Sequence, residues 1–230
     1  MTTFAIIPAR GGSVGVPRKN LRIIAGIPLI AHILRAAKAS SEADMVFVST
    51  EDDEIAHVAH AEGAAVIRHP THLSEGSRAS FGVIKHAVRQ WKKAGLPDML
   101  VMLRATTPLT TSADIDGAIR VLRSHPQADS VVGVSETRVH PHRVYRIDKK
   151  GRLIPFDRLH AEQRYPRRRQ TFSEAYVRTA GLYVTRPDIV LGGSLWGDVV
   201  LPHLVPRERA VNINDELDFR IAEMLLKERP

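Results

Sequence analysis

Short apolar runs alternate with amphipathic stretches along the first part of the chain. The apolar runs have the length of buried strands, and the stretches between them repeat apolar side chains at the 3.6-residue spacing of a helix. Strands are predicted over residues 4–9, 45–49, 64–68, 99–103 and 130–134, and helices over 28–37, 51–63, 77–94 and 112–122. Strands and helices that alternate over short links predict an α/β fold, in which a mostly parallel sheet carries helices on both faces.

Helix boundaries follow from capping residues. Pro28 is predicted to begin the first helix, since proline suits the first turn. Thr50 precedes an acidic first turn and Ser112 precedes an amphipathic stretch, so both are predicted to be N-caps. A closing helix is predicted over residues 215–228. The apolar side chains on its face are Leu217, Ile221 and Leu225.

The alternation stops after the fifth predicted strand. Two short apolar runs, 144–148 and 153–156, flank a Lys-Lys-Gly turn and predict a β-hairpin. A basic stretch with prolines follows, and strand character returns at residues 181–184. We therefore predict a single domain over residues 1–230, with a small β-rich lobe inserted at residues 137–178.

The composition excludes several classes of protein. Apolar residues make up 43% and charged residues 25%, which is ordinary for a soluble globular protein. The sequence contains no apolar run long enough to span a membrane, and its start lacks the charged segment of a secretory signal. Cysteine is absent, which excludes disulfides and thiolate metal sites and suits a reducing cytoplasm. We expect a cytoplasmic protein whose metal ligands, if any, are oxygen atoms or histidines.

The net charge of +8 raises the question of nucleic-acid binding. The densest basic cluster is confined to residues 164–169, and aromatic residues are only 5%, so no series of stacking platforms is visible. The cluster itself is either an anion clamp or a solvated basic loop. A site for a polyanionic small molecule explains the charge equally well, and we rank a nucleic-acid binder last.

A glycine-rich loop with three cationic side chains directly follows the first predicted strand. It runs Pro8-Ala9-Arg10-Gly11-Gly12-Ser13-Val14-Gly15-Val16-Pro17-Arg18-Lys19-Asn20. Glycines let backbone N–H groups approach an anion closely, and the cationic side chains add the charge that a polyphosphate requires. The loop matches neither the Walker pattern nor a Gly-x-Gly-x-x-Gly turn that opens into a helix. A tight turn with solvated basic residues is the alternative to a phosphate-binding loop.

Further motifs follow this loop in order through nearly the whole chain. The later segments are Gly26-Ile27-Pro28-Leu29-Ile30, Val48-Ser49-Thr50-Glu51-Asp52, Arg68-His69-Pro70, Thr106-Thr107-Pro108-Leu109, Asp114-Ile115-Asp116 and Glu216-Leu217-Asp218-Phe219. Together with the opening loop, they resemble the acylneuraminate cytidylyltransferases, or CMP-sialic acid synthetases. The resemblance implies a nucleotide-diphospho-sugar transferase-like, Rossmann-like sheet and a homodimer formed through the lobe.

The implied reaction is the transfer of cytidylyl from CTP to a sialic-acid-like 2-keto acid, with release of pyrophosphate. The implied cofactor is Mg²⁺ or Mn²⁺, and the implied partners are CTP and a small acidic acceptor, with no membrane. Arg10, Lys19 and Arg104 are the implied catalytic residues. The implied nucleotide-binding residues are Ala9, Arg10, Gly11, Gly12, Ser13, Lys19, Asn20, Arg68, Ala79 and Ser80. Arg68 and Ser80 would read cytosine. The alternative interpretation is that Arg68 is an ordinary surface arginine at a strand end.

One departure from the family concerns the metal. The family usually carries aspartates where Asn212 and Asn214 stand, and uses them around the magnesium ion. Amide oxygens can coordinate a metal but carry no charge. The implied metal ligands are Asn212, Asn214 and Asp215, and Asp215 is equally an ordinary first-turn acid of the closing helix.

Other departures concern the acceptor. Arg104 replaces a usual glutamine and adds a fixed charge suited to a carboxylate or a dianion, unless it is a plain surface change. Val177 and Thr179 replace a usual arginine and asparagine, and Leu195-Trp196 replaces an aromatic pair. The residues expected to bind the acceptor are Arg104, Thr106, Arg168, Arg178, Tyr183 and Trp196.

These changes leave the phosphate loop intact. The leading hypothesis is therefore a cytidylyltransferase that acts on an acidic sugar. The alternatives are a cytidylyltransferase for a different acidic acceptor, such as a phosphonate, and a CTP-binding relative whose catalysis is impaired.

Overall fold

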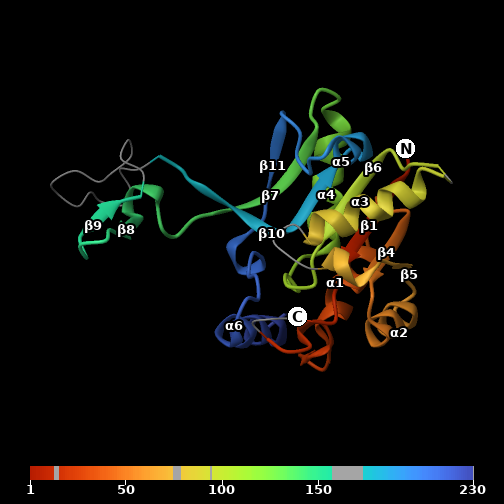
Figure 1. The fold of residues 1–230 in the computed structure, drawn as a ribbon, viewed down its shortest axis with the longest axis horizontal. Coiled ribbons are helices and arrows are strands. Elements are labelled where there is room, and N and C mark those ends of the chain that lie inside the picture. Colours follow the sequence, from red (N-terminus) through yellow and green to blue (C-terminus); the bar gives the residue numbers. More distant parts are fainter. Residues whose placement is uncertain (13–15, 75–78, 94, 157–172, 230) are drawn as a thin grey trace.

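The computed structural model describes residues 1–12, 16–74, 79–93, 95–156 and 173–229 (Figure 1). Within these residues, a seven-stranded sheet has the strand order β11-β7-β10-β6-β1-β4-β5 and forms the centre of the body. A narrow arm extends from one side of this body and carries a separate two-stranded sheet, β8-β9.

The main sheet is mostly parallel. β1 pairs in parallel with β4 and β6, β4 with β5, and β11 with β7, whereas β10 runs antiparallel between β6 and β7. The strands are β1 (Thr3–Pro8), β4 (Met45–Thr50), β5 (Ala65–Arg68), β6 (Met99–Leu103), β7 (Ser130–Glu136), β10 (Tyr176–Thr185) and β11 (Val200–Leu204). The α/β class predicted from the alternating pattern is confirmed.

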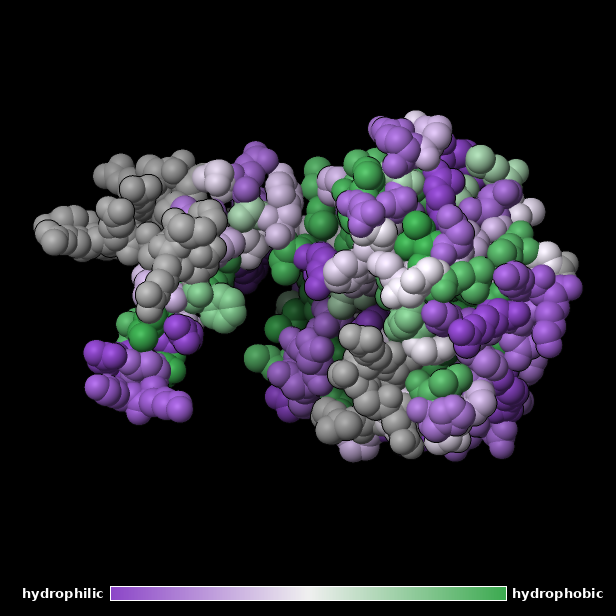
Figure 2. All heavy atoms as spheres, turned by 45° about the horizontal axis from the view of Figure 1, so that its top comes forward, coloured by the Kyte–Doolittle hydropathy of each residue, from purple (hydrophilic) through white to green (hydrophobic). Residues whose placement is uncertain are grey.

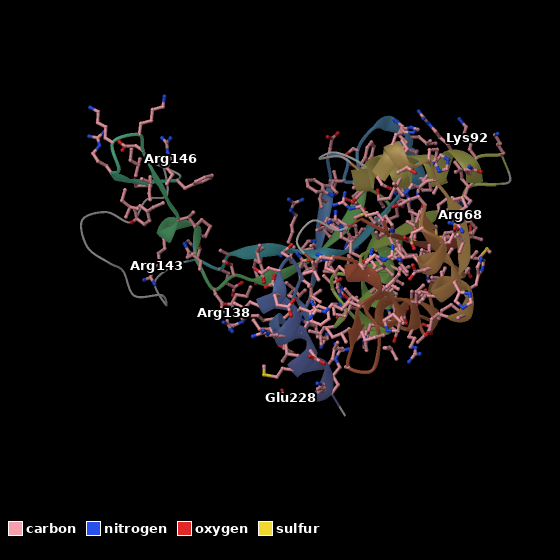
Figure 3. The ribbon with its side chains drawn as sticks, turned by 60° about the horizontal axis from the view of Figure 1, so that its bottom comes forward. Arg68, Lys92, Arg138, Arg143, Arg146 and Glu228 are labelled. Carbon is pink, nitrogen blue, oxygen red and sulfur yellow. The ribbon has the colours of Figure 1, made fainter. Side chains whose placement is uncertain are left out.

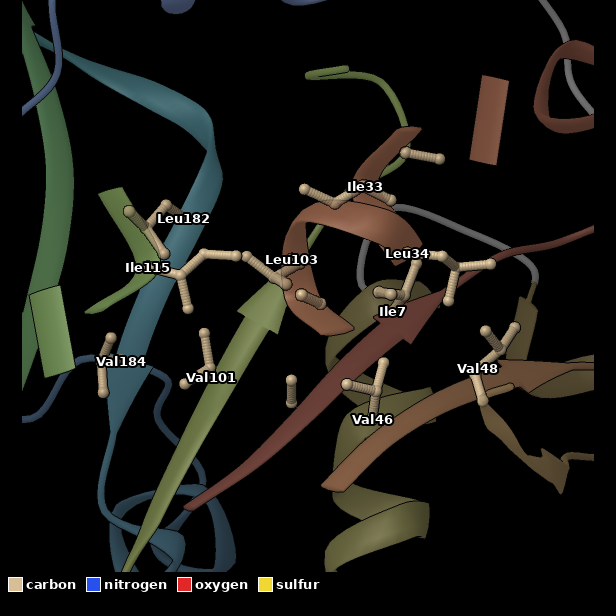
Figure 4. Close-up of a cluster of buried hydrophobic side chains, with 14 of the residues drawn as sticks. Ile7, Ile33, Leu34, Val46, Val48, Val101, Leu103, Ile115, Leu182 and Val184 are labelled. Atoms are coloured by element: carbon tan, nitrogen blue, oxygen red, sulfur yellow. The ribbon is translucent and has the colours of Figure 1, made fainter. Parts of the chain in front are cut away.

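Helices cover both faces of this sheet because its central strands are apolar on both sides. In β6, Val101 and Leu103 join the core beneath α1, α2 and α4, while Leu100 and Met102 join the core beneath α3 and α5 (Figure 4 shows the first cluster). The helices are α1 (Leu29–Lys38), α2 (Asp53–Ala61), α3 (Ala79–Trp91), α4 (Ser112–Ser124), α5 (Pro187–Gly192) and α6 (Glu216–Lys227). The short elements are β2 (Ile23–Ile24), β3 (Ile27–Pro28) and the 3-10 turns η1 (Lys19–Leu21), η2 (Thr71–Ser74), η3 (Pro141–Arg143) and η5 (Arg207–Arg209).

Two predicted helix caps are wrong by one or two residues. Thr50 is the last residue of β4, and Asp52 caps α2 by accepting a hydrogen bond from the Ile55 amide. Ser112 is the first residue of α4, and Thr111 is its cap. In both cases the residue that caps the helix has an extended backbone, so its side-chain oxygen reaches the N3 amide. Pro28, predicted to begin α1, is its N-cap residue.

The predicted apolar face of the closing helix is also wrong. Leu217 and Ile221 are exposed, and the helix α6 buries Phe219 and Ala222 instead. The reason is its position, because α6 packs beside Ile24 in a small separate core rather than on the main sheet (Figure 1).

The edge strand β11 and the short helix α5 were not predicted. β11 contains Pro202, which lacks a backbone N–H and argues against a strand in sequence analysis. It is tolerated here because β11 is the last strand of the sheet and pairs only with β7. At six residues, α5 is too short to give a helical repeat.

The arm carries the predicted hairpin. β8 (Tyr145–Ile147) pairs antiparallel with β9 (Leu153–Pro155), as the apolar runs around the Lys-Lys-Gly turn indicate. Figure 2 shows the arm standing apart from the body, with hydrophobic side chains both on the arm and on the body surface facing it. Ile147, Leu153 and Phe156 are 74%, 67% and 70% exposed. None of the described helices has the length and apolar character needed to cross a lipid bilayer.

Candidate functional site

The phosphate loop begins where β1 ends, at the edge of the sheet where the parallel strands β1, β4 and β6 have their carboxyl ends. Ligand sites of open α/β sheets lie at this edge. Ala9 donates its amide to the carbonyl of Ser49 at 2.9 Å, so the loop leaves the sheet beside the end of β4. Asn20 is buried and its amide nitrogen donates to the carbonyl of Arg10 at 2.9 Å. Asn20 therefore fixes the loop's path, and Ser13 lies outside the described residues.

Lys19 joins this loop to a distant segment of the chain. Its Nζ donates to the carbonyl oxygen of Ile213 at 2.8 Å, and the amide of Ile213 donates to the carbonyl of Thr106 at 2.8 Å. Burial lowers the pKa of Lys19. These bonds bring together a predicted phosphate ligand, a predicted acceptor residue and the segment of the predicted metal ligands. This group is the part of the predicted site that the structure brings together.

Two acids after β4 hold the beginning and end of the phosphate loop. Glu51 accepts a hydrogen bond from the Gly11 amide at 2.9 Å, and Asp52 pairs with Arg18 at 2.5 Å. The hydrogen bond from Arg18 holds the pKa of this guanidinium above its usual value. A Cβ at Gly11 would lie 3.0 Å from the Asp52 Cγ, so a larger residue there would force the Asp52 carboxylate to move. Arg18 is thus engaged by the protein's own acids.

The predicted base-reading residues lie at the other side of the loop. Arg68, at the end of β5, is half exposed and pairs with Asp53 at 2.6 Å. Figure 3 shows it on the side of the body away from the arm. Ala79 and Ser80 form the first turn of α3. The exposed ion pair is what the alternative of a surface arginine predicts, and none of the contacts of Arg68 with the described residues points into the site.

Two arginines of the predicted acceptor set lie on neighbouring strands, with Arg104 directly after β6 and Arg178 in β10 before the register of that strand shifts. Arg104 donates its amide to the carbonyl of Gly181 at 3.3 Å, and its Nε is buried with no hydrogen-bond partner among the described residues. The guanidinium of Arg178 stacks on the Trp196 ring, 4.1 Å from its centre. The register of β10 shifts after Arg178. The regular alternation of side chains between the two faces of the sheet is therefore interrupted at this point.

Two members of the predicted acceptor set do not join this group. Tyr183 is only 7% exposed and packs in the core beneath α3 and α5, so the structure gives it a packing role. Arg168 lies outside the described residues. Thr106 is half-buried, and its carbonyl accepts from Ile213.

Of the three predicted metal ligands, Asn212 and Asn214 are neutral and Asp215 is acidic. The Asn212 amide nitrogen donates to the Asn214 side-chain oxygen at 3.1 Å, while the Asp215 carboxylate caps α6 together with Asp218. Among the described residues, no group of three or more acidic or histidine side chains is placed to hold a metal. Amide oxygens alone do not build a protein-held Mg²⁺ site, but they fit an ion held mainly by substrate phosphates.

Sequence analysis missed three supporting residues: Glu51, His69 and Ser74. All three are joined by hydrogen bonds beneath the phosphate loop. The signal was available, because Glu51 and His69 lie in two of the motifs that carry the family resemblance and follow directly after the strands β4 and β5.

Comparison with known proteins agrees with this geometry. A family model described as Cytidylyltransferase matches residues 4–190. N-acylneuraminate cytidylyltransferase A of Danio rerio is 31% identical over 95% of this chain and 49% of its own length. The N-acylneuraminate cytidylyltransferase of Streptococcus agalactiae (strain NEM316) is 31% identical over 95% of this chain and 52% of its length. The chain thus spans about half the length of these curated relatives.

A relative of similar length is the Post-translational flagellin modification protein B of Campylobacter coli, 29% identical over 97% of this chain and 94% of its own. Two solved structures share the fold. CMP:2-keto-3-deoxy-manno-octonic acid synthetase complexed with CTP has a TM-score of 0.74 at 17% identity, covering 99% of both chains. A 4-diphosphocytidyl-2C-methyl-D-erythritol synthase has a TM-score of 0.67 at 13% identity, covering 98% of both. Together with the matched residues, these findings establish that the chain belongs to the cytidylyltransferase family.

Proposed function

We propose that the chain transfers the cytidylyl group of CTP to an acidic sugar and releases pyrophosphate. The observation that carries the proposal is the link from Lys19 through Ile213 to Thr106, which joins the phosphate loop to the acceptor side. Membership of the family supports CTP as the donor. The names of the relatives, which include N-acylneuraminate cytidylyltransferases, support an acidic sugar as the acceptor.

In this reaction a hydroxyl oxygen of the sugar attacks the α-phosphorus of CTP. A new P–O bond forms, the bond to the oxygen that bridges to the β-phosphate breaks, and pyrophosphate leaves while the hydroxyl proton passes to solvent. The protein's task is to position the phosphates and stabilise charge on the leaving group. Lys19 and Arg10 supply fixed charge, and among the described residues no atom beyond the chain neighbours of Gly12 lies within 4 Å of its Cβ position. The amides of Gly12 and Ser13 complete the phosphate contacts in this proposal.

The proposed cofactor is Mg²⁺, or Mn²⁺, held chiefly by the phosphates. The side-chain oxygen of Asn212 is the protein's own contribution, because Asn214 and Asp215 are engaged within the segment and the α6 cap. The ion would neutralise phosphate charge when bound.

An acidic acceptor is favoured by two guanidiniums, that of Arg104 directly after β6 and that of Arg178 in β10. The buried Arg104 Nε has no partner among the described residues, and a carboxylate of the acceptor would provide one. Arg178, oriented by its stacking on Trp196, adds a second positive charge. The same pair would suit another acidic acceptor such as a phosphonate. The neutral pair Asn212–Asn214 is what favours the second candidate function, a CTP-binding protein with impaired catalysis.

We further propose a homodimer formed through the arm. A two-stranded hairpin is marginally stable by itself, and apolar side chains as exposed as those of Ile147 and Leu153 are rarely left in solvent. Burial against a second copy would cover them.

The absence of cysteine from the sequence supports a cytoplasmic location.

The direct test is pyrophosphate release from CTP with Mg²⁺ and a panel of 2-keto-acid sugars and phosphonates. Release with at least one acidic acceptor is expected, together with its loss in Lys19→Met and its retention in Lys38→Met, an exposed lysine of α1. Tight CTP binding without release from any acceptor would contradict transfer and favour the impaired relative. Restoring aspartate at Asn212 and Asn214 would then test whether the neutral segment is the cause.

A further inference from the structure

A buried histidine lies beneath the phosphate loop and contacts side chains from two other segments. The side chain of His69, which follows β5, is 1% exposed. Its Nδ1 lies 2.9 Å from the hydroxyl of Ser49, at the end of β4. Its Nε2 lies 3.1 Å from a carboxylate oxygen of Glu51 and within hydrogen-bond distance of the Ser74 hydroxyl. The ring therefore touches the end of β4 and the turn η2 at once.

One proton arrangement satisfies all of these contacts. Burial lowers the pKa of His69 and outweighs the opposite effect of Glu51, so the ring is neutral. With its proton on Nε2, the ring donates to the Ser74 hydroxyl, beside the Glu51 carboxylate, and accepts at Nδ1 from the Ser49 hydroxyl. The Ser74 hydroxyl donates to the same Glu51 oxygen at 3.3 Å. A neutral ring with two partnered nitrogens is a rigid connector between its neighbours.

The two partners of Nε2 are the groups that hold the start of the phosphate loop. The second carboxylate oxygen of Glu51 accepts from the Gly11 amide at 2.9 Å. The carbonyl of Ser74 accepts from Nη1 of Arg10 at 3.0 Å. Ser74 therefore lies between His69 and Arg10, and Glu51 lies between His69 and Gly11. His69 contacts neither Arg10 nor Gly11 directly.

We propose that His69 is a positioning residue, which orients Glu51 and Ser74 so that the Gly11 amide and the Arg10 guanidinium are held ready for the phosphates of the nucleotide. The part of this inference that concerns the nucleotide rests on the proposed function. Glycines give the loop freedom, and the hydrogen bonds of the Gly11 amide and the Arg10 guanidinium restrict it at its start.

The same ring ties the phosphate side to the base side. His69 directly follows Arg68, and Ser74 ends the turn that leads to α3, whose first residues are the predicted base-reading positions. A shift of the ring would displace the loop relative to α3. CTP binding would then weaken, whereas binding of the acceptor, on the Arg104 side, would not change.

The test measures the loop directly and the nucleotide separately. Hydrogen–deuterium exchange of the Gly11 amide reports the loop, and calorimetry reports the Kd for CTP. His69→Leu removes both ring contacts, and His69→Gln keeps an N–H donor near the position of Nε2. Glu51→Ala removes the acceptor for Gly11 and leaves the ring, and it serves if His69→Leu fails to fold. His72→Leu changes an exposed histidine of η2 and is the matched control.

We expect exchange of the Gly11 amide and the Kd for CTP each to rise about tenfold in His69→Leu and in Glu51→Ala, as the loss of a hydrogen bond to a charged group implies. His69→Gln should recover most of both, and His72→Leu should match the wild type. In turnover, KM for CTP should rise while KM for the acceptor stays the same.

Two results would overturn the proposal. One is unchanged exchange of the Gly11 amide in a folded His69→Leu protein, whatever Glu51→Ala shows, and the other is a His69→Gln protein as impaired as His69→Leu. A wild-type protein that does not bind CTP refutes the proposed function, and Gly11 exchange still decides whether His69 holds the loop.

Discussion

Replacing Gly181 with alanine should destabilise the protein and disturb the acceptor side of its site. Gly181 lies in β10, where its carbonyl accepts a hydrogen bond from the Arg104 amide. An ideal Cβ there would lie 2.6 Å from the Cβ and 2.7 Å from the Cγ2 of Thr107, and closer still to its hydroxyl. The φ angle of Gly181 is not positive, so the cost of the substitution is steric.

The magnitude follows from how firmly Thr107 is held. Thr107 is buried, its hydroxyl donates to the Arg104 carbonyl at 3.0 Å, and it accepts from the Thr110 hydroxyl at 3.3 Å. Thr107 cannot swing away without breaking these bonds. Overpacking of this kind costs about 1–3 kcal/mol. For a chain of this length, a loss of about 2 kcal/mol lowers Tm by about 4–8 °C.

The assay is thermal unfolding of Gly181→Ala beside Gly192→Ala. Gly192 is the last residue of α5, where nothing lies within 4 Å of the Cβ position, so its replacement should leave Tm unchanged or slightly higher. Because the Thr107 loop adjoins Thr106 and Arg104, Gly181→Ala should also raise KM for the acceptor. A Gly181→Ala protein that melts with the wild type would refute the packing of β10 against this loop.

Three further outcomes follow from the described contacts. Arg209→Met leaves the buried Asp114 carboxylate without its charged partner and should lower the free energy of unfolding in urea by about 3–5 kcal/mol. Arg207→Met, at an exposed position, should lower it by less than about 0.5 kcal/mol. Burial opposes ionisation of Asp114, but hydrogen bonds from Arg209 and Thr111 outweigh it and lower the pKa of Asp114. Its stabilising contribution is therefore complete above the unfolded pKa of about 4 and is lost as pH falls through the folded value, and this acid-side slope of stability should be weaker in Arg209→Met. The double substitution Ile147→Glu and Leu153→Glu should shift sedimentation toward the monomer, and a dimer that persists would contradict assembly through the arm.

Much of the fold could be predicted because the central strands are buried on both faces and the main helices are amphipathic. The buried stripe of α4, which includes Ile115 and Leu122, was readable from spacing alone. The face of α6 was not, because its apolar positions do not reveal that it packs on Ile24 and Ile213 rather than on the sheet. β11 was missed because a proline in a strand is compatible only with an edge, and edges are set by tertiary structure.

The candidate site likewise contains parts that could be predicted from the sequence and parts that could not. A phosphate-binding loop was predicted from the glycines and cations after β1, and the structure joins Lys19 of this loop to the segment of Asn212 through the Ile213 carbonyl. A backbone carbonyl carries no sequence signal, so this contact could not be predicted. The engagement of Arg18 by Asp52 was equally hidden, since it depends on the distance between the loop and the start of α2.

The proposed cytidylyl transfer requires a sugar hydroxyl to attack the α-phosphorus of CTP. This step is tested with an acidic sugar labelled with ¹⁸O in the attacking hydroxyl, together with ³¹P NMR and mass spectrometry of the products. The expected product is a CMP-sugar that carries the label in its P–O–C bridge, formed in step with unlabelled pyrophosphate. Unlabelled CMP-sugar, or CTP left intact in the presence of every acidic acceptor of the panel, would contradict it.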